Sequence, residues 1–208
     1  RRDNSRGVCL KFISMKAALT LLLCLALSGC LVPWVRVSAS LPDPNQRANE
    51  LLELSFKQNL GDHPLAIKTA QAALELFQSV NNVDGIAKSY EHLGQYYLAQ
   101  NKLAESERYY DLALKIRRQQ PRLDLQADVL INLAMLAVRK GDWLNGVSYA
   151  TQAHNLMNEQ SDARIMGRIA GTMAYIFYNS GLPESALEQY QRAMEYYRQA
   201  GANRGAVR

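Results

Sequence analysis

The apolar residues of this chain follow two different patterns. An unbroken apolar run, Ala17–Leu27, lies near the N-terminus and contains no charged residue. From about residue 46 onward the apolar residues recur at i, i+3, i+4 and i+7, a spacing that places them on one face of an α-helix. The pattern therefore predicts a short apolar segment followed by a long region of amphipathic helices.

The helical region repeats itself every 40 residues. Four windows align at this spacing, and the turn-forming residues at their second position are Gly61, Asn101, Gly141 and Gly181. Two columns of small residues accompany them: Ala66, Ser106, Gly146 and Ala186, then Ala73, Ala113, Ala153 and Ala193. Small residues let two helices cross closely, so each unit is predicted to be two helices joined by a short turn. The predicted units are residues 47–86, 87–126, 127–166 and 167–206, within a domain spanning 46–206.

The first helix of each later unit also aligns. Its columns are Tyr90/Leu130/Ala170, Leu93/Leu133/Met173, Gly94/Ala134/Ala174 and Tyr97/Ala137/Phe177. The first unit departs from this pattern, because Glu53 and Leu54 stand where Leu and Gly are expected. Its apolar residues are shifted off the columns: Ala48, Leu51, Leu52 and Phe56. A terminal helix has only one neighbour, so we interpret this helix as the N-terminal cap.

These columns resemble the tetratricopeptide repeat: a large residue, Leu, Gly/Ala and Tyr on the first helix, a turn, and then Ala, Tyr and Ala on the second. The 40-residue period is similar to the longer subclass of that family, rather than to its common length of about 34 residues. The resemblance implies an all-α, helical-hairpin repeat solenoid of about four repeats, stacked as a right-handed superhelix. The first helix of each repeat would line its concave side.

The last unit raises a question about its neighbour. Its second helix carries an apolar face that a further unit would cover: Ala186, Leu187, Tyr190, Ala193, Met194 and Tyr197. Residues 207–208 would begin a fifth repeat. With no polar capping helix in the sequence and no initiating methionine at residue 1, we expect the chain to be a fragment of a longer reading frame.

The distribution of charge argues against nucleic-acid binding. The formal net charge is +5, but residues 1–29 hold five of the basic residues and one acidic residue. The remaining residues are nearly balanced and show no long basic stripe that could follow a phosphate backbone. No nucleic-acid partner is predicted.

The apolar run is typical of a secretory signal. Met15 and Lys16 precede it, and its 11 residues are too few for a comfortable membrane span. Residues 1–29 are accordingly interpreted as leader and signal peptide. Leu27-Ser28-Gly29-Cys30 resembles the lipobox of bacterial lipoproteins, in which the cysteine becomes the acylated N-terminus. Val37-Ser38-Ala39 is a competing site for ordinary cleavage before Ser40.

The cysteines favour the lipobox. Cys9 precedes the presumed start and Cys24 lies inside the apolar run, so Cys30 alone would remain in the exported chain and could form no internal disulfide. We expect Cys30 to be the lipidation site and residues 30–45 to be a flexible tether. Leu31, rather than Asp, follows the cysteine, and the resemblance then implies a periplasmic protein anchored in the outer membrane.

The sequence shows no catalytic or cofactor-binding motif. There is no phosphate-binding loop, no H-E-x-x-H and no C-x-x-C. His63, His92 and His154 fall at three different repeat positions and are not expected to converge on a metal ion. We predict no catalytic residues, no metal site and no cofactor.

The resemblance points to a peptide-binding groove. In the family, positions 2, 5, 9 and 12 of the first helix line the groove. The residues at these positions are Lys88, Glu91, Gln95, Leu98, Asp128, Ile131, Met135, Val138, Arg168, Gly171, Tyr175 and Tyr178. Glu91 and Gln95 replace the Lys and Asn with which chaperone-binding relatives hold a C-terminal carboxylate, so that ligand is disfavoured. An apolar centre and a charged rim favour a peptide or helix with aliphatic anchors.

Two functions follow as hypotheses. The first is a non-catalytic protein-interaction scaffold, exported and lipid-anchored in the bacterial envelope, that binds a protein segment in its groove. The alternative is the N-terminal sensing or scaffold region of a larger signalling protein, such as a sensor kinase, a diguanylate cyclase or a CHAT-type protease. The sequence does not identify the partner or the oligomeric state.

Overall fold

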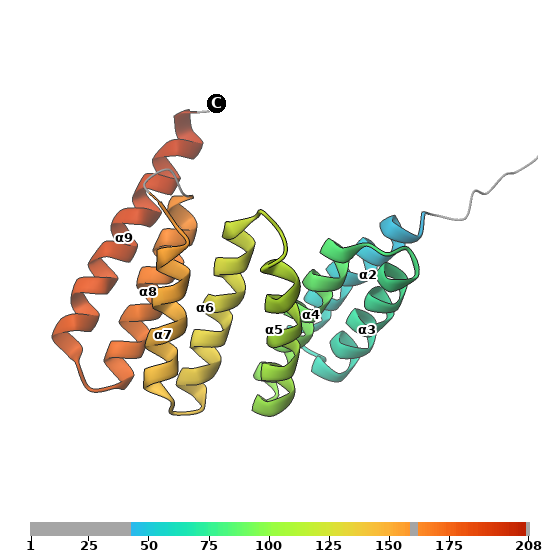
Figure 1. Cartoon of the computed structure of the whole chain (residues 1–208), viewed down its shortest axis with the longest axis horizontal. Helices are drawn as coiled ribbons and strands as arrows, with labels where there is room; N and C mark the ends of the chain where they lie inside the picture. The colour runs from blue at the N-terminus through green and yellow to red at the C-terminus, as the bar shows by residue number, and fades with distance from the viewer. Residues whose placement is uncertain (1–42, 159–161, 207–208) are drawn as a thin grey trace, which may run out of the picture. The chain divides into compact units, whose positions relative to one another are not determined.

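A computed structural model describes residues 43–158 and 162–206, and within these ranges every regular element is a helix (Figure 1). The helices are α2 (Pro44–Gln58), α3 (His63–Ser79), α4 (Val83–Ala99), α5 (Leu103–Arg117), α6 (Leu123–Arg139), α7 (Trp143–Asn155), α8 (Ala163–Asn179) and α9 (Pro183–Ala206). They pack as four successive hairpins, α2–α3, α4–α5, α6–α7 and α8–α9, and each hairpin contacts the next. The fold is the predicted all-α helical-repeat solenoid. The right-handed sense of the superhelix stays a prediction.

Most helices begin at a polar residue whose side chain caps the first turn. The carboxylates of Asp62 and Asp142 accept hydrogen bonds from the backbone N–H groups of Leu65 and Asn145, at 2.9 and 3.1 Å. Asn82 caps α4 in the same way through the N–H of Gly85. These side chains satisfy N–H groups that have no partner inside the helix, which fixes where each helix starts.

The turns inside the last three hairpins are short and alike. Each has three residues between its two helices, and its middle residue is left-handed: Asn101 (φ 59°), Gly141 (φ 75°) and Gly181 (φ 81°). In all three turns the next N–H bonds back five residues, to a carbonyl near the end of the first helix, at 2.9 Å. Glycine and asparagine adopt this conformation most readily, which explains the turn column of the sequence.

The first hairpin differs by one residue. Its turn has four residues, 59–62, and Gly61 is not left-handed. The additional residue shifts α2 by one position relative to the later first helices, so Ala48, Leu52 and Ser55 become its buried residues. The shift seen in the sequence is thus real, but Phe56 does not belong to the buried set, because it is 52% exposed.

Small residues allow the two helices of a hairpin to cross closely. A Cβ atom added to Gly94 of α4 would lie 2.7 Å from the ring of Tyr110 on α5, and the Ser106 hydroxyl donates a 2.8 Å hydrogen bond to the Gly94 carbonyl. The small-residue columns lie in these crossings, where all four alanines of the second column are at most 4% exposed. The ring of Tyr110 fills the space that the glycine leaves, which is dense packing of the kind found in protein cores.

The last helix leaves an apolar stripe uncovered. Ala186 and Ala193 are buried against α8, but four larger side chains of α9 are exposed: Leu187 (59%), Tyr190 (41%), Met194 (63%) and Tyr197 (47%). The sequence predicted this face. Of the four corresponding residues of α3, Ile67, Ala70 and Phe77 are at most 8% exposed because the next hairpin covers them, and Leu74 is partly buried against the same cluster.

Residues 1–42 contain the predicted signal segment, Cys30 and most of the predicted tether, and these lie outside the described residues. The last three residues of the predicted tether are described and are not a linker: Asp43 caps α2, and Pro44 and Asn45 are its first two residues. Among the helices that the structure does describe, none combines the length and the hydropathy needed to cross a membrane.

Candidate binding surface

The predicted groove residues lie on the first helices of the hairpins. α6 contacts α8, and α4 contacts both α2 and α6, so these helices form a continuous layer. We call the outward surface of this layer the first-helix face. Ten residues at the predicted groove positions are at least partly exposed on α4, α6 and α8: Lys88, Glu91, Gln95, Leu98, Asp128, Met135, Arg168, Gly171, Tyr175 and Tyr178.

Two predicted groove residues belong to the core instead. Ile131 is 3% exposed and packs in the cluster around Leu130 and Ala153, and Val138 is 5% exposed beside Ala150. The prediction was wrong for Ile131 because this residue stands at position 5 of the first helix, which points toward the second helix of the same hairpin. Gly171 confirms this direction, because a Cβ atom there would face the Cβ of Ala193 on α9 at 3.9 Å. Leu98 is half-buried against the same cluster as Ile131.

Glu91 also stands at position 5, and it binds a buried arginine. Arg117, the last residue of α5, is 0% exposed. Its Nε donates to Glu91 Oε1 at 2.7 Å, and its Nη1 donates to Asp84 Oδ1 at 2.5 Å and to Gln120 Oε1 at 2.8 Å. A buried guanidinium is tolerated only with such partners. Arg117 therefore links the end of α5 to the start and middle of α4.

This network sets the protonation of its carboxylates. Burial would raise the pKa of Asp84, but the hydrogen bonds from Lys88 and Arg117 outweigh it and the pKa is lowered. Burial raises the pKa of Glu91, and the attraction of Arg117 offsets only part of that effect. Arg117 itself stays charged, because Glu91 and Asp84 outweigh its desolvation and raise its pKa. The result is a fixed, largely neutralised patch on α4.

A second ion pair crosses from α6 to α8. Arg168 donates through Nη1 to Asp128 Oδ1, and burial raises the pKa of Asp128 despite this partner. The pair lies in a hollow of about 670 Å³ between α6, α8 and the end of α9. Its other charged lining residues are Asp124, Asp162 and Arg164. This end of the first-helix face thus carries opposite charges side by side, with no strong excess of either sign.

A more apolar hollow of about 420 Å³ lies between α2 and α4. Phe56, Leu52 and His92 form its walls, and Lys57 and Lys88 lie at its edge. His92 Nδ1 lies 2.9 Å from the Tyr96 hydroxyl, which lies 2.9 Å from Ser55 Oγ. Ser55 donates its own proton to the Leu52 carbonyl at 2.7 Å, so Tyr96 donates to Ser55 and His92 Nδ1–H donates to Tyr96. Burial, followed by the charge of Lys88, lowers the pKa of His92.

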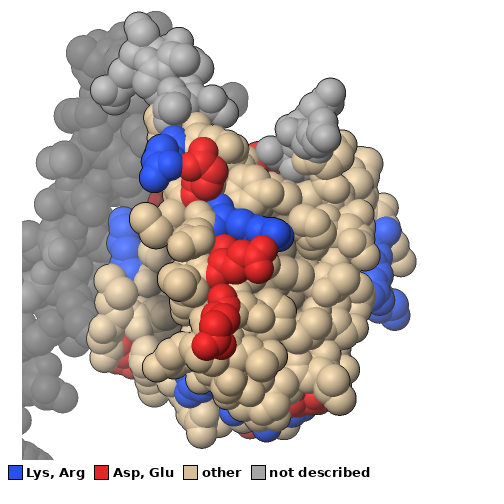
Figure 2. All heavy atoms as spheres, turned by 90° about the vertical axis from the view of Figure 1, so that its left-hand side faces the viewer, with Lys and Arg blue, Asp and Glu red and all other residues tan. Residues whose placement is uncertain are grey.

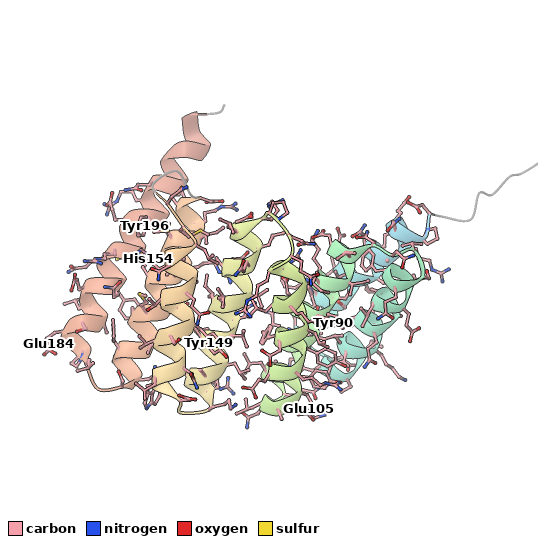
Figure 3. The ribbon with its side chains drawn as sticks, viewed as in Figure 1. Tyr90, Glu105, Tyr149, His154, Glu184 and Tyr196 are labelled. Carbon is pink, nitrogen blue, oxygen red and sulfur yellow. The ribbon has the colours of Figure 1, made fainter. Side chains whose placement is uncertain are left out.

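The three histidines lie on three different helices, α3, α4 and α7. His63 contacts Asn59 at the start of α3, while His154 is exposed near the end of α7. His154 and Tyr196 line a hollow of about 330 Å³ beside α8 (Figure 3). No cluster of three or more histidine, cysteine or acidic side chains suited to a metal ion occurs among residues 43–158 and 162–206.

Sequence reasoning missed the part played by Arg117. Its column reads Phe77, Arg117, Met157, Tyr197, so a charged residue interrupts an otherwise apolar position. That interruption was a usable signal, because a charge in a buried column needs a partner on the neighbouring helix. The missed partner was Asp84, one turn from Lys88.

The architecture defines a helical-repeat solenoid of the kind that presents a surface for proteins. Residues 55–119 match the family described as tetratricopeptide repeat, which agrees with the resemblance of the columns. The match covers α3, α4 and α5 and supports a tetratricopeptide-repeat protein. A search of curated proteins finds no match to this chain.

Two solved structures share the fold. The crystal structure of BtubC (BKLC) from P. vanneervenii is 19% identical with a TM-score of 0.63, over 77% of this chain and 66% of that chain. Aspartyl phosphate phosphatase F from Bacillus subtilis is 15% identical with a TM-score of 0.68, over 76% of this chain and 42% of that chain. At these identities the similarity concerns the fold, and the chain spans less than two thirds of either protein.

Proposed function

We propose that this chain is a non-catalytic scaffold that binds a peptide or helix of a partner protein along its first-helix face. The observation that carries the proposal is the group formed by Met135, Tyr175 and Tyr178. The first two are partly exposed and Tyr178 is 64% exposed, although each is a large side chain next to a well-packed core. Tyrosine and methionine contribute strongly to protein contacts when they are accessible.

The neighbouring charges fit the same proposal. Lys88 pairs with Asp84 at 2.8 Å, and Arg168 pairs with Asp128, so the charged positions of the face are already neutralised. A ligand held by charge alone would need an unpaired excess of one sign. We therefore expect affinity to come from apolar anchors on Met135, Tyr175 and Tyr178, and the ion pairs to set the register of the ligand.

The test uses a charge introduced into the centre of the face. Ligand peptides would be selected from a displayed library against the wild-type protein, and their binding would be measured by fluorescence anisotropy. We expect Met135→Glu/Tyr175→Glu to weaken binding by at least about tenfold, since a lost anchor costs more than about 1.4 kcal/mol. Leu144→Glu is the matched control, because Leu144 is 86% exposed on α7, away from the face. If the Met135→Glu/Tyr175→Glu variant and the Leu144→Glu control bind the peptides with equal affinity, the proposal that the first-helix face is the binding site is wrong.

We also propose export and anchoring through Cys30, in the bacterial periplasm and at the outer membrane. The support is the sequence alone: an apolar run that ends in Leu-Ser-Gly-Cys, and a single cysteine left after processing. Fractionation of cells expressing wild type and Cys30→Ala would test it. Release of the variant from the membrane fraction is expected. A variant that stays membrane-bound would contradict lipidation, and processing after Ala39 would be seen as a free mature chain beginning at Ser40.

A further inference from the structure

Three side chains with metal-binding atoms line one hollow between the third and fourth hairpins. The hollow of about 330 Å³ is lined by His154 near the end of α7, by Met157 just after that helix, and by Met166 in the first turn of α8. A smaller hollow of about 200 Å³ is again lined by His154 and Met166. An imidazole and a thioether from two neighbouring helices therefore border the same space.

The spacing in the chain keeps two of these groups close together. His154 and Met157 are three residues apart, and the Met157 N–H donates to the His154 carbonyl at 3.0 Å, so the backbone is still turning there as at a helix end. Residues at this spacing share one face, with their Cβ atoms about 5–6 Å apart. Met166 joins them from α8, which packs against α7. One nitrogen donor and two sulfur donors thus border one hollow.

The imidazole of His154 is not committed to another group. Nδ1 of His63 and Nδ1 of His92 each lie 2.9 Å from a side-chain oxygen, of an asparagine and of a tyrosine respectively. In the part of the chain that the structure describes, no side-chain hydrogen bond or ion pair engages His154, which is exposed. Imidazole is the commonest metal ligand in proteins, and this ring has its nitrogens available.

The second hairpin carries different residues at the same repeat positions. His154 stands where that hairpin has Leu114, which is 4% exposed, and Met157 stands where it has the fully buried Arg117. In the third hairpin the first of these positions is exposed and the second is partly exposed. Groups with donor atoms therefore replace buried residues at a boundary that is open to solvent, and this indicates a site rather than a packed core.

The lining favours one kind of ion. The described lining of both hollows includes no carboxylate and no thiolate, and carboxylates are the usual ligands of Ca²⁺ and Mg²⁺. Thioether sulfur is a soft ligand that selects Cu(I), and imidazole also suits copper. Figure 2 shows the α9 end of the array, where acidic and basic side chains lie next to one another in a narrow band with uncharged atoms around it. A cation would therefore be held by the donor atoms rather than by a general negative field.

From these observations we propose that the hollow binds one Cu(I) ion through an imidazole nitrogen of His154 and the thioether sulfurs of Met157 and Met166. Tyr196 of α9 lines both hollows beside this site (Figure 3). Met173 lies seven residues after Met166, about 10.5 Å further along α8, and is not in the ligand set. None of the three ligands is a predicted groove residue, so the proposal is independent of the peptide-binding function.

Competition against a coloured Cu(I) chelator, with ascorbate present and oxygen excluded, measures the affinity. The full chain is used with Cys9, Cys24 and Cys30 replaced by serine, because free thiols bind the same ion. We expect this cysteine-free chain to bind one Cu(I) ion. It should bind Zn²⁺ far more weakly, since thioethers are poor ligands for harder ions.

Variants of the cysteine-free chain test the ligand set. Met157→Leu/Met166→Leu and His154→Gln should each lower the affinity for Cu(I) at least about 100-fold, because even residues that only support a metal ligand contribute about 10- to 100-fold. Leucine has nearly the volume of methionine, so the packing is kept, and circular dichroism checks that each variant is folded. Met173→Leu is the matched control on α8 and should bind like the cysteine-free chain.

NMR of methionine methyl groups provides a second measurement, with Ag(I) as a stable substitute for Cu(I). One equivalent should shift the methyl signals of Met157 and Met166 and leave those of Met135 and Met173 in place. The proposal is wrong if the cysteine-free chain binds no Cu(I), or if Met157→Leu/Met166→Leu binds it as tightly. An equal loss of affinity in Met173→Leu would also overturn it, because the methionines would then act through packing.

Discussion

The two ends of the array are built from the same kind of hairpin, but the first end exposes a mainly polar surface and the last end an apolar one. The outer helix of the first hairpin, α2, exposes mostly charged or polar side chains, among them Arg47, Glu50, Glu53 and Lys57. The outer helix of the last hairpin, α9, exposes the apolar stripe. The hairpin alone therefore does not determine which residues are buried. Each hairpin buries the outer stripe of the one before it, and stability accumulates through these boundaries.

The largest effect should come from truncating equivalent residues at the two ends. Phe77→Ala removes a fully buried ring and is expected to lower the free energy of unfolding by about 4 kcal/mol. Tyr197→Ala acts at the same column, where the side chain is 47% exposed, and should cost less than about 1 kcal/mol. Urea denaturation measures both. Similar losses would show that burial by the next hairpin does not distinguish the ends.

A smaller loss of stability is expected on replacing Arg117, which stands at the same repeat position in the second hairpin. Arg117→Ala leaves Glu91 without its partner and should cost about 2 kcal/mol, below the usual figure for a buried pair because Asp84 is 46% exposed. The double variant Arg117→Met/Glu91→Leu should recover most of the loss, since apolar residues of similar size suit this position. Failure of the double variant to recover stability would mean that the network is needed to join α4 and α5.

The smallest expected effect is a change of stability with pH, which arises at His92 on α4, in the second hairpin. The pKa of His92 is lowered below its ordinary value of 6.5, so the unfolded chain binds its proton more readily than the folded chain. This contribution is fully present above about pH 6.5 and is lost as the pH falls through the lower, folded-state value. We expect this loss to be smaller than the losses caused by Phe77→Ala and Arg117→Ala.

His92→Gln should flatten the pH dependence of stability below about pH 6.5, compared with the wild type. Thermal unfolding measured across this range distinguishes the variant from the wild type. An unaltered profile in His92→Gln would place the pH sensitivity elsewhere.

The fold could be predicted from the sequence because its determinants are local and periodic. The alanine column at residues 73, 113, 153 and 193 marks every crossing, and Asn101, Gly141 and Gly181 mark the turns. The first turn was harder, because Gly61 aligns with the turn column although its turn has one more residue. The shift of α2 becomes interpretable only when both ends of the turn are known.

The candidate surface was predicted less well, because accessibility depends on neighbouring helices. Ile131 and Val138 looked like groove anchors when helix positions were carried over from the family, but the second helices of the array bury them. Met135 is partly exposed and Tyr178 is 64% exposed. Arg117 was missed because its two acidic partners lie 33 and 26 residues earlier in the chain.

Each hairpin of the array contacts only the hairpins next to it, and this arrangement has a mechanical consequence. α2 touches α3 and α4, and α8 touches α6, α7 and α9, so no described contact ties the first hairpin directly to the last. A small rotation at each of the boundaries can add up along the chain while every crossing stays packed. The array can then behave as an elastic spring, in which Lys88 and Tyr178 move apart or together as tension changes, without the loss of any single contact.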